Sequence, residues 1–191
     1  MTAGPNRNNG VTLVELLVVI TVAAILAFFA VPDLADFVKN NRNSSDINDL
    51  LSSVSYARSE AVKRNSSVTI CQSANGTSCQ NSAGSWGGGW LVFEDINRDG
   101  SVTAGADTIL RVSSGIGSGR SLGFSATRVI YRSSGLASEG TNATFTLCDD
   151  RGASHAKGLI IGASGHPRVA RDSNDNDVVE GADGADVACG S

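Results

Sequence analysis

Oxygen-bearing side chains alternate in one segment near the middle of the chain. Asp95, Asn97 and Asp99 are spaced two residues apart, and Gly100 follows them. This order matches the first six positions of a calcium-binding loop, in which alternate oxygen ligands precede a glycine at a sharp turn. Because hard cations prefer carboxylate and amide oxygens, the segment is a candidate calcium site.

Three neighbouring residues weaken the calcium interpretation. The twelfth position, where a bidentate glutamate should lie, is Ala106, and Asp107 comes one residue late. Arg98 adds a positive charge within the loop. Asn, Asp and Gly are equally typical of a turn between two strands, so a hairpin without metal is the alternative, and no cofactor is predicted.

A second group of side chains has the chemistry to contact phosphate. Arg168 and Arg171 lie close together near the C-terminal end, and Lys157, His155 and His166 precede them. Such cationic side chains bind nucleic-acid phosphates without reading the base sequence. No aromatic residue is interleaved for base stacking, so nucleic-acid binding is an alternative rather than the main interpretation.

Charge is unevenly distributed along the chain. The 191 residues carry a formal net charge of −4, but residues 39–171 hold fourteen Lys and Arg against ten Asp and Glu. Residues 172–191 hold six acidic residues and no Lys or Arg, and such a tail would repel a polyanion bound nearby. Its simplest interpretation is a solvated, partly disordered end.

The four cysteines indicate disulfides rather than a metal site. Cys71, Cys79, Cys148 and Cys189 form no CxxC pair, and the chain has only two histidines, so a zinc site is not expected. An even number of cysteines beyond a membrane segment suggests disulfides in an oxidising compartment. Of three pairings, proximity in sequence favours Cys71–Cys79 and leaves Cys148–Cys189; four reduced thiols in a cytosolic head are the alternative.

No segment has the pattern of a catalytic site. The histidines are not paired at a useful spacing, and no serine lies in a nucleophile-elbow motif. The glycine-rich residues 86–90 lack the lysine and the helix that follow a phosphate-binding loop. The sequence therefore predicts a protein that is not an enzyme.

One carboxylate lies inside an otherwise apolar run. Residues 11–31 contain a single ionisable side chain, Glu15, and a helix of that length spans about 30 Å, the thickness of a bilayer's hydrocarbon core. A secretory signal would have a shorter apolar stretch and small residues at its exit, whereas Phe28 and Phe29 precede Ala30 here. A plain membrane anchor fits the length but leaves the charge of Glu15 unexplained.

Proteolysis between Gly10 and Val11 would explain Glu15. The cut would leave a new amino group about one helical turn from the carboxylate. The two charges could then neutralise each other across neighbouring subunits in an apolar environment. The carboxylate would also lie near the first turn of the helix, where the macrodipole favours a negative charge. Glu15 is thus predicted to guide assembly.

The residues around this cut carry a family resemblance. Residues 10–17 resemble the signal of type IV pilins and type II secretion pseudopilins, usually written G-F-T-L-x-E, which a prepilin peptidase cuts after the glycine before methylating the new N-terminus. The resemblance implies cleavage after Gly10 and methylation of Val11, which stands where Phe is usual. Pro32 resembles the helix-bending proline of the family, and proline chemistry predicts a kink or local melting there.

Beyond Pro32 the sequence predicts that the helix continues to about Arg64 and ends at residues 65–67. Apolar residues recur at spacings of three and four, which indicates one buried stripe. The stripe consists of Ile47, Leu50, Leu51, Val54, Ala57, Ala61 and Val62. Residues 56–64 are similar to the helix end of the GspH/FimT/FimU minor pilins and pseudopilins.

Short segments with strand character follow the helix. They are residues 68–71, 90–93, 108–112, 124, 129–131, 144–148 and 158–161. Gly-, Ser- and Asn-rich turns separate them, which predicts one antiparallel sheet or two small ones laid on the helix. The expected fold class is α+β: a long, kinked N-terminal transmembrane helix packed against an antiparallel β-sheet head.

The order of the cysteines, residues 89–93 and Gly165 also resembles the GspH/FimT/FimU subgroup over nearly the full chain. Some FimT-type members bind DNA during natural transformation through a G-R-x-R motif. Gly165 and Arg168 keep part of that motif, whereas His166 replaces its first arginine and Arg171 is displaced.

The resemblance implies a structural subunit that primes or joins a type IV pilus or a type II secretion pseudopilus. A DNA-binding pilus-tip subunit is the alternative. Implied partners are other pilins or pseudopilins, an inner-membrane assembly platform, the prepilin peptidase and a tip adhesin. The chain would lie in the bacterial inner membrane with a periplasmic head, and later in the filament. The expected parts are a leader (1–10), a transmembrane half-helix (11–31), an amphipathic periplasmic half-helix (32–64), a β-rich head (65–171) and an acidic tail (172–191).

Overall fold

The computed structural model describes residues 11–80 and 86–190, except for the side chains of residues 27–33. The chain divides into two compact units, Met1–Asn41 and Arg42–Ser191. A single helix, α1 (Leu13–Arg64), contributes to both. The predicted leader, including Gly10, lies outside the described residues.

The C-terminal end of α1 is set by Asn65. This residue adopts a left-handed conformation with φ 51°. The amide of Asn65 donates to the Val62 carbonyl at 3.3 Å, and the amide of Ser66 donates to the Ala61 carbonyl at 3.2 Å. These bonds form the pattern in which a left-handed residue closes a helix, so the predicted end at Arg64 is confirmed.

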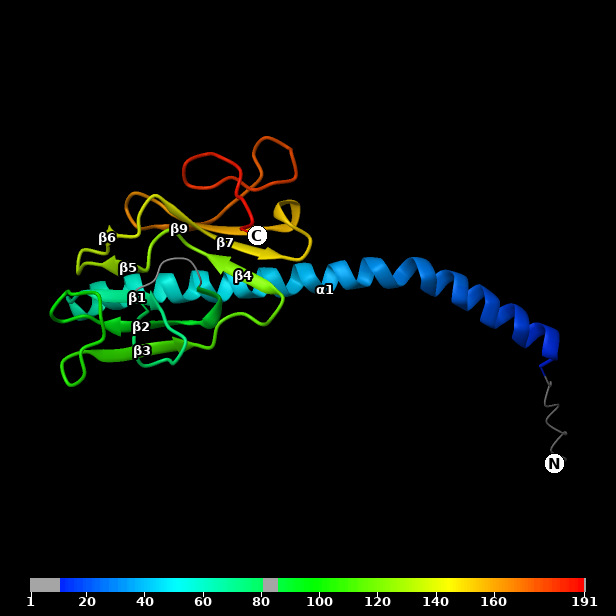
Figure 1. The fold of residues 1–191 in the computed structure, drawn as a ribbon, viewed down its shortest axis with the longest axis horizontal. Helices are drawn as coiled ribbons and strands as arrows, with labels where there is room; N and C mark the ends of the chain where they lie inside the picture. The colour runs from blue at the N-terminus through cyan, green and yellow to red at the C-terminus, as the bar shows by residue number, and fades with distance from the viewer. Residues whose placement is uncertain (1–10, 81–85, 191) are drawn as a thin grey trace, which may run out of the picture. The chain divides into compact units, whose positions relative to one another are not determined.

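Within the described residues, nine strands form two antiparallel sheets beside the helix (Figure 1). The first sheet has the order β3-β2-β1-β5-β6 and the second the order β4-β7-β8-β9. The strands of the first sheet are β1 (Val68–Gln72), β2 (Trp90–Glu94), β3 (Thr108–Ser113), β5 (Arg128–Tyr131) and β6 (Ala137–Glu139). Those of the second are β4 (Arg120–Gly123), β7 (Ala143–Asp149), β8 (Lys157–Ile161) and β9 (Pro167–Val169). Two short 3-10 turns, Trp86–Gly88 and Ala153–His155, complete the elements.

One hydrophobic core joins the last part of α1 to both sheets. Leu50 and Val54 of the helix are fully buried in it, together with Ile70 of the first sheet and Phe145 of the second. The Phe145 ring stacks on Phe124 with centroids 3.7 Å apart. Because the helix supplies one wall of this core, residues 42–64 belong structurally to the head.

The predicted stripe on α1 is correct except at its end. Ile47, Leu50, Val54, Ala57 and Ala61 are buried, whereas Val62 is 54 % exposed. One helical residue turns the side chain by about 100°, so Val62, directly after Ala61, points away from the core.

Three strands were not predicted from the sequence. The strand expected at residue 124 is instead β4, which ends at Gly123. β6 and β9 have only three residues each and lie at the edges of their sheets. Such short edge strands lack enough alternation to stand out from turn residues.

Candidate assembly end and head sites

The helix starts immediately after the predicted cleavage point. The amide of Glu15 donates to Thr12 Oγ1 at 3.2 Å, and the amide of Leu16 donates to the Thr12 carbonyl at 3.1 Å. Thr12 is therefore the N-cap of α1, and Glu15 lies in the first turn, where the helix dipole stabilises a carboxylate. The order Thr-x-x-Glu is that of a capping box, which the sequence prediction missed.

The first part of α1 presents apolar side chains without cover. All side chains of residues 11–26 are exposed, for example Leu13 at 79 % and Ile20 at 57 %. The hydroxyl of Thr21 donates to the carbonyls of Leu17 and Val18 at 3.0 and 2.8 Å. That polar group is thus satisfied inside the helix, as an apolar environment requires.

The predicted membrane span includes residues whose side chains the structure does not describe. Within the part of the chain that the structure describes, no helix is long and apolar enough to cross a membrane. The predicted span, residues 11–31, includes residues whose side chains are not described, so the span stays a prediction. α1 is helical through Pro32, which argues against local melting, and the kink there stays a prediction.

Two disulfides cross-link the head. Cys71 is bonded to Cys79, and Cys148 is bonded to Cys189. This is the pairing that sequence proximity favours. The first bond ties β1 to the loop that follows it, and the second ties β7 to the C-terminal tail.

The tail is folded against the second sheet, so the prediction of a partly disordered end is wrong for residues 172–190. Val187 is 8 % exposed and packs with Cys148 and Ala156, while Val187 N donates to the Val179 carbonyl at 3.0 Å. The buried Glu180 accepts a hydrogen bond from the amide of Ser173 at 2.9 Å. Sequence charge alone missed this packing because it depends on a few apolar residues and one disulfide.

Carboxylates of α1 pair with arginines of the sheets. Asp49 accepts hydrogen bonds from Arg111 at 2.8 Å and from Ser113 at 2.9 Å. Asp46 pairs with Arg120; burial raises the pKa of Asp46 although that guanidinium opposes the shift. These links fix the helix to β3 and β4.

A buried polar cluster connects α1 to β7. Asn43 Nδ2 donates to Asp149 Oδ2 at 2.8 Å, and Arg151 Nη2 donates to the same oxygen at 2.7 Å. Hydrogen bonds from Arg151 hold the pKa of Asp149 well below its usual value. Sequence patterns do not predict this cluster, because Asn43 lies 106 residues from Asp149.

Arg168 and Arg171 are both exposed, and neither forms an ion pair with any described residue. Arg168 lies on β9 opposite Ile160 of β8. A groove beside the β8–β9 turn is lined by Arg58, Lys63 and His166, among others. The Arg171 carbonyl also accepts a hydrogen bond from Glu180 N at 3.2 Å, so the acidic tail starts directly beside these arginines.

The alternating segment forms the connection between β2 and β3. Asp95 is fully buried, whereas Asn97 and Asp99 are exposed. Asn97 Oδ1 accepts from the amide of Asp99 at 3.3 Å, and Asp99 Oδ1 accepts from the amide of Ser101 at 2.7 Å. Among the described residues, no group of three or more His, Cys, Asp or Glu is arranged to hold a metal ion.

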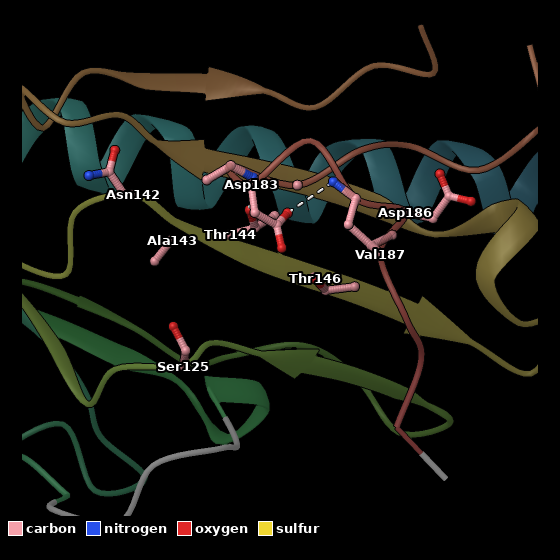
Figure 2. A pocket seen from close by; sticks show the side chains of 11 residues that line it. Ser125, Asn142, Ala143, Thr144, Thr146, Asp183, Asp186 and Val187 are labelled. Atoms are coloured by element: carbon pink, nitrogen blue, oxygen red, sulfur yellow. Dashed lines mark hydrogen bonds between the residues drawn. The ribbon is translucent and has the colours of Figure 1, made fainter. Parts of the chain in front are cut away.

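A hollow lies between β7 and the tail (Figure 2). Thr144 and Thr146 of β7 line it from one side, and Asp183, Asp186 and Val187 of the tail line it from the other. Thr144 Oγ1 accepts a hydrogen bond from Ala182 N at 2.8 Å, and Asp183 Oδ1 accepts one from Ala185 N at 3.1 Å. The first of these bonds attaches the tail to β7. The residues that line the hollow therefore have a structural role, and the hollow is not a candidate binding site.

Comparison with known proteins decides the family. The family of the type II transport protein GspH matches residues 46–165, more than half of the chain. The chain belongs to the GspH family. The prokaryotic N-terminal methylation motif also matches, at residues 5–31.

Solved structures support the fold of this GspH-family chain. The type IV minor pilin FimU of Pseudomonas aeruginosa, in space group P21, is 21 % identical; the match covers 71 % of this chain and 92 % of that one, with a TM-score of 0.56. The same protein in space group P65 is 20 % identical, with coverages of 67 % and 92 % and a TM-score of 0.53. Among curated protein sequences, none matches the chain.

These matches confirm the resemblance and the fold class expected from the sequence. The chain is a GspH/FimT/FimU-like pilin, with a long N-terminal helix packed on antiparallel sheets. The family model and the N-terminal methylation motif are those of pilin-like and pseudopilin-like structural subunits.

Proposed function

We propose that the chain is cut after Gly10, methylated on Val11 and incorporated through α1 into a pilus or pseudopilus. Before assembly, residues 11–31 hold it in the inner membrane with the Arg42–Ser191 unit in the periplasm. Its partners are other pilins or pseudopilins, the assembly platform and the prepilin peptidase, with a tip adhesin as a further candidate.

The observation that carries this proposal is an uncovered apolar helix with one carboxylate in its first turn. The side chains of residues 11–26 are exposed, so they need lipid or neighbouring helices as their environment. A charged side chain costs about 2.5–3.5 kcal/mol at a bilayer centre, so a charged Glu15 is unfavourable in an apolar environment unless it is paired. The amino group of a mature Val11 would be four residues, or about 6 Å of helical rise, away, and could offset that cost in a neighbouring subunit.

The N-terminal methylation motif supports the same processing step. It matches residues 5–31, which include the proposed cut. The cap made by Thr12 fits a mature chain beginning at Val11, because α1 then starts within its first residues. Cleavage would thus leave the helix start intact while creating the charge that Glu15 requires.

The test compares Glu15→Ala with Thr12→Ala in the full chain expressed in its own bacterium. Mass spectrometry of the native polypeptide should find a methylated Val11 as first residue. Glu15→Ala should stay membrane-bound but fall about tenfold or more in sheared filaments, the effect of roughly 1.4 kcal/mol. Thr12→Ala perturbs the same turn and keeps the carboxylate, so it should assemble better than Glu15→Ala. An intact leader, or equal incorporation of Glu15→Ala and the unaltered chain, contradicts the proposal.

Deletion of the gene separates the two machines that use such subunits. Loss of surface pili with normal secretion assigns the chain to a type IV pilus. Loss of secreted proteins with normal pili assigns it to a type II secretion pseudopilus.

DNA binding is the second candidate function, and the exposed, unpaired Arg168 and Arg171 support it. Arg58 and His166 also line a groove that includes Pro167, the residue before Arg168, while the adjacent acidic tail opposes a polyanion. A gel shift at low salt tests it. The double variant Arg168→Ala, Arg171→Ala should lose binding while the control Arg132→Ala, also at an exposed arginine, retains it; absence of any shift rejects this function.

A further inference from the structure

Asp95 is a buried carboxylate whose two oxygens differ in their hydrogen bonds. Its side chain is fully buried. Oδ2 accepts hydrogen bonds from Thr69 Oγ1 at 2.8 Å and from the amide of Gly100 at 3.0 Å. Oδ1 is buried as well and accepts no hydrogen bond from the residues that the structure describes. Buried polar atoms are nearly always satisfied, and a charged one is costly without a partner.

No cationic side chain of the described residues compensates Asp95. Arg128 does contact this loop, but its Nη1 donates to the carbonyls of Asp99 and Gly100, at 3.2 and 2.7 Å. Its ion pair is with Glu139, at 3.3 Å. The carboxylate of Asp95 therefore lacks an ion-pair partner among the side chains that the structure describes.

The loop turns back on Asp95 at Gly100. Gly100, the sixth residue counted from Asp95, has φ +72° and donates its amide back to Asp95. A side chain at Gly100 would collide with Arg128. Asp95 is thus hydrogen-bonded across the turn that carries Asn97 and Asp99, and Gly100 makes the sharp turn that a calcium loop has at its sixth position.

Asp107, one residue beyond the twelfth position of the loop, does not act as the twelfth ligand. Its Oδ1 accepts from the amide of Ile96 at 3.0 Å, and its Oδ2 accepts from the amide of Thr103 at 2.8 Å. Asp107 therefore joins the two ends of the loop through the backbone. This role closes the loop without contributing a metal ligand.

We propose that the β2–β3 loop binds a calcium ion through Asp95 Oδ1, with Asp99, Asn97 and loop carbonyls as the remaining oxygen ligands. The site has only two acidic ligands, and its other ligands are neutral oxygens, which calcium also binds. Asn97 Nδ2 donates to Asp99 Oδ2 at 2.8 Å, and calcium replaces that bond. Two carboxylates and an exposed loop correspond to affinity in the range of about 0.1–1 mM, as in extracellular modules. Magnesium should bind more weakly, because it demands near-ideal octahedral geometry and gives up its water ligands reluctantly.

The experiment is thermal unfolding of the detergent-solubilised full chain in EDTA, in calcium and in magnesium, with isothermal titration to count bound ions. Calcium at one hundred times its Kd should raise Tm by roughly 5–10 °C. Magnesium at the same concentration should produce less than half of that shift. Titration should give one ion per chain.

Variants assign the ion to this loop. Asp95→Asn keeps the hydrogen bonds to Thr69 and Gly100 but removes the charge, so the calcium-induced shift should vanish. Asp99→Asn, at an exposed position that does not threaten folding, should weaken binding at least about tenfold. Asp175→Asn makes the same change of charge at an exposed position in the tail and should leave the shift unchanged.

Three results would overturn the proposal. The first is an equal Tm in EDTA and in 10 mM calcium. The second is a calcium shift that survives in both loop variants. The third is a shift lost in Asp175→Asn, which would place the ion on the tail.

Discussion

Asp149 shows how one side chain can stabilise the junction between the helix and the second sheet. It is 3 % exposed and its partner Arg151 is 11 % exposed. Hydrogen bonds from Arg151 lower the pKa of Asp149 below its ordinary value of 3.8. A group with a lowered folded-state pKa adds stability above its unfolded pKa, and that stability is lost as pH falls through the folded value.

The resulting prediction concerns acid unfolding of the protein. Asp149→Asn should lower the free energy of unfolding by about 2 kcal/mol near neutral pH, because the neutral amide loses the charge-assisted hydrogen bonds that Arg151 donates to the carboxylate. The deficit should shrink as pH falls below about 4, where the native chain loses the same contribution. Urea unfolding between pH 7 and pH 2.5 measures it, with exposed Asp177→Asn as control. A deficit that stays constant over this pH range contradicts the assignment.

For single residues, the sequence predicted a bonding partner correctly where the two residues lie close together along the chain. Cys71 and Cys79 are eight residues apart, and their bond followed from proximity. Asn43 and Asp149 are separated by 106 residues, and Asp46 and Arg120 by 74. Those pairings depend on the packing of α1 against the second sheet, which periodicity does not specify.

At the level of elements, the C-terminal tail depends on its disulfide. The Cys148–Cys189 bond closes a loop of 41 residues, whereas Cys71–Cys79 closes one of 8. Chain-entropy estimates give about 4 kcal/mol for the longer loop and about 2.5 kcal/mol for the shorter. The tail itself contributes few buried apolar residues, so it should be the first part to open when its bond is removed.

The corresponding prediction compares two double variants. Cys148→Ser with Cys189→Ser should make residues 172–188 sensitive to limited proteolysis while the sheets stay protected, because the tail loses its covalent link to β7. Cys71→Ser with Cys79→Ser removes the disulfide of the first sheet, which does not link the tail, and should leave these residues resistant. Mass spectrometry of the fragments locates the cuts. Equal resistance of the tail in both variants would show that its noncovalent contacts suffice.

Helix and strand prediction differed in accuracy for a physical reason. The repeat of apolar residues on α1 located both its buried face and its end, since Asn65 can adopt the closing conformation that most residues avoid. β6 and β9 were missed because each contributes only three residues at a sheet edge. These short strands form because they pair with a neighbouring strand, and their own residues show no alternating pattern that would predict them.

At the scale of the whole chain, composition and structure divide the helix differently. Hydropathy changes after residue 31 and the helical pattern ends after residue 64, which predicts boundaries at those two positions. The compact units meet instead after Asn41, because Ile47, Leu50 and Val54 complete the core of the head. A boundary set by packing is invisible to hydropathy alone, since both sides of it are helical.

This division predicts which fragment folds by itself. A chain beginning at Arg42 retains every helical residue that is buried among the described side chains, and it should give a soluble head with a cooperative thermal transition. A chain beginning at Ser55 lacks Ile47, Leu50 and Val54, each worth about 1.5–3 kcal/mol of burial. Their combined loss is comparable to the whole stability of a typical domain, about 5–15 kcal/mol. The shorter fragment should therefore show no cooperative transition in near-ultraviolet circular dichroism, which reports on the packing of Trp86 and Trp90. Equal transitions in the two fragments would mean that the sheets hold the core without the helix.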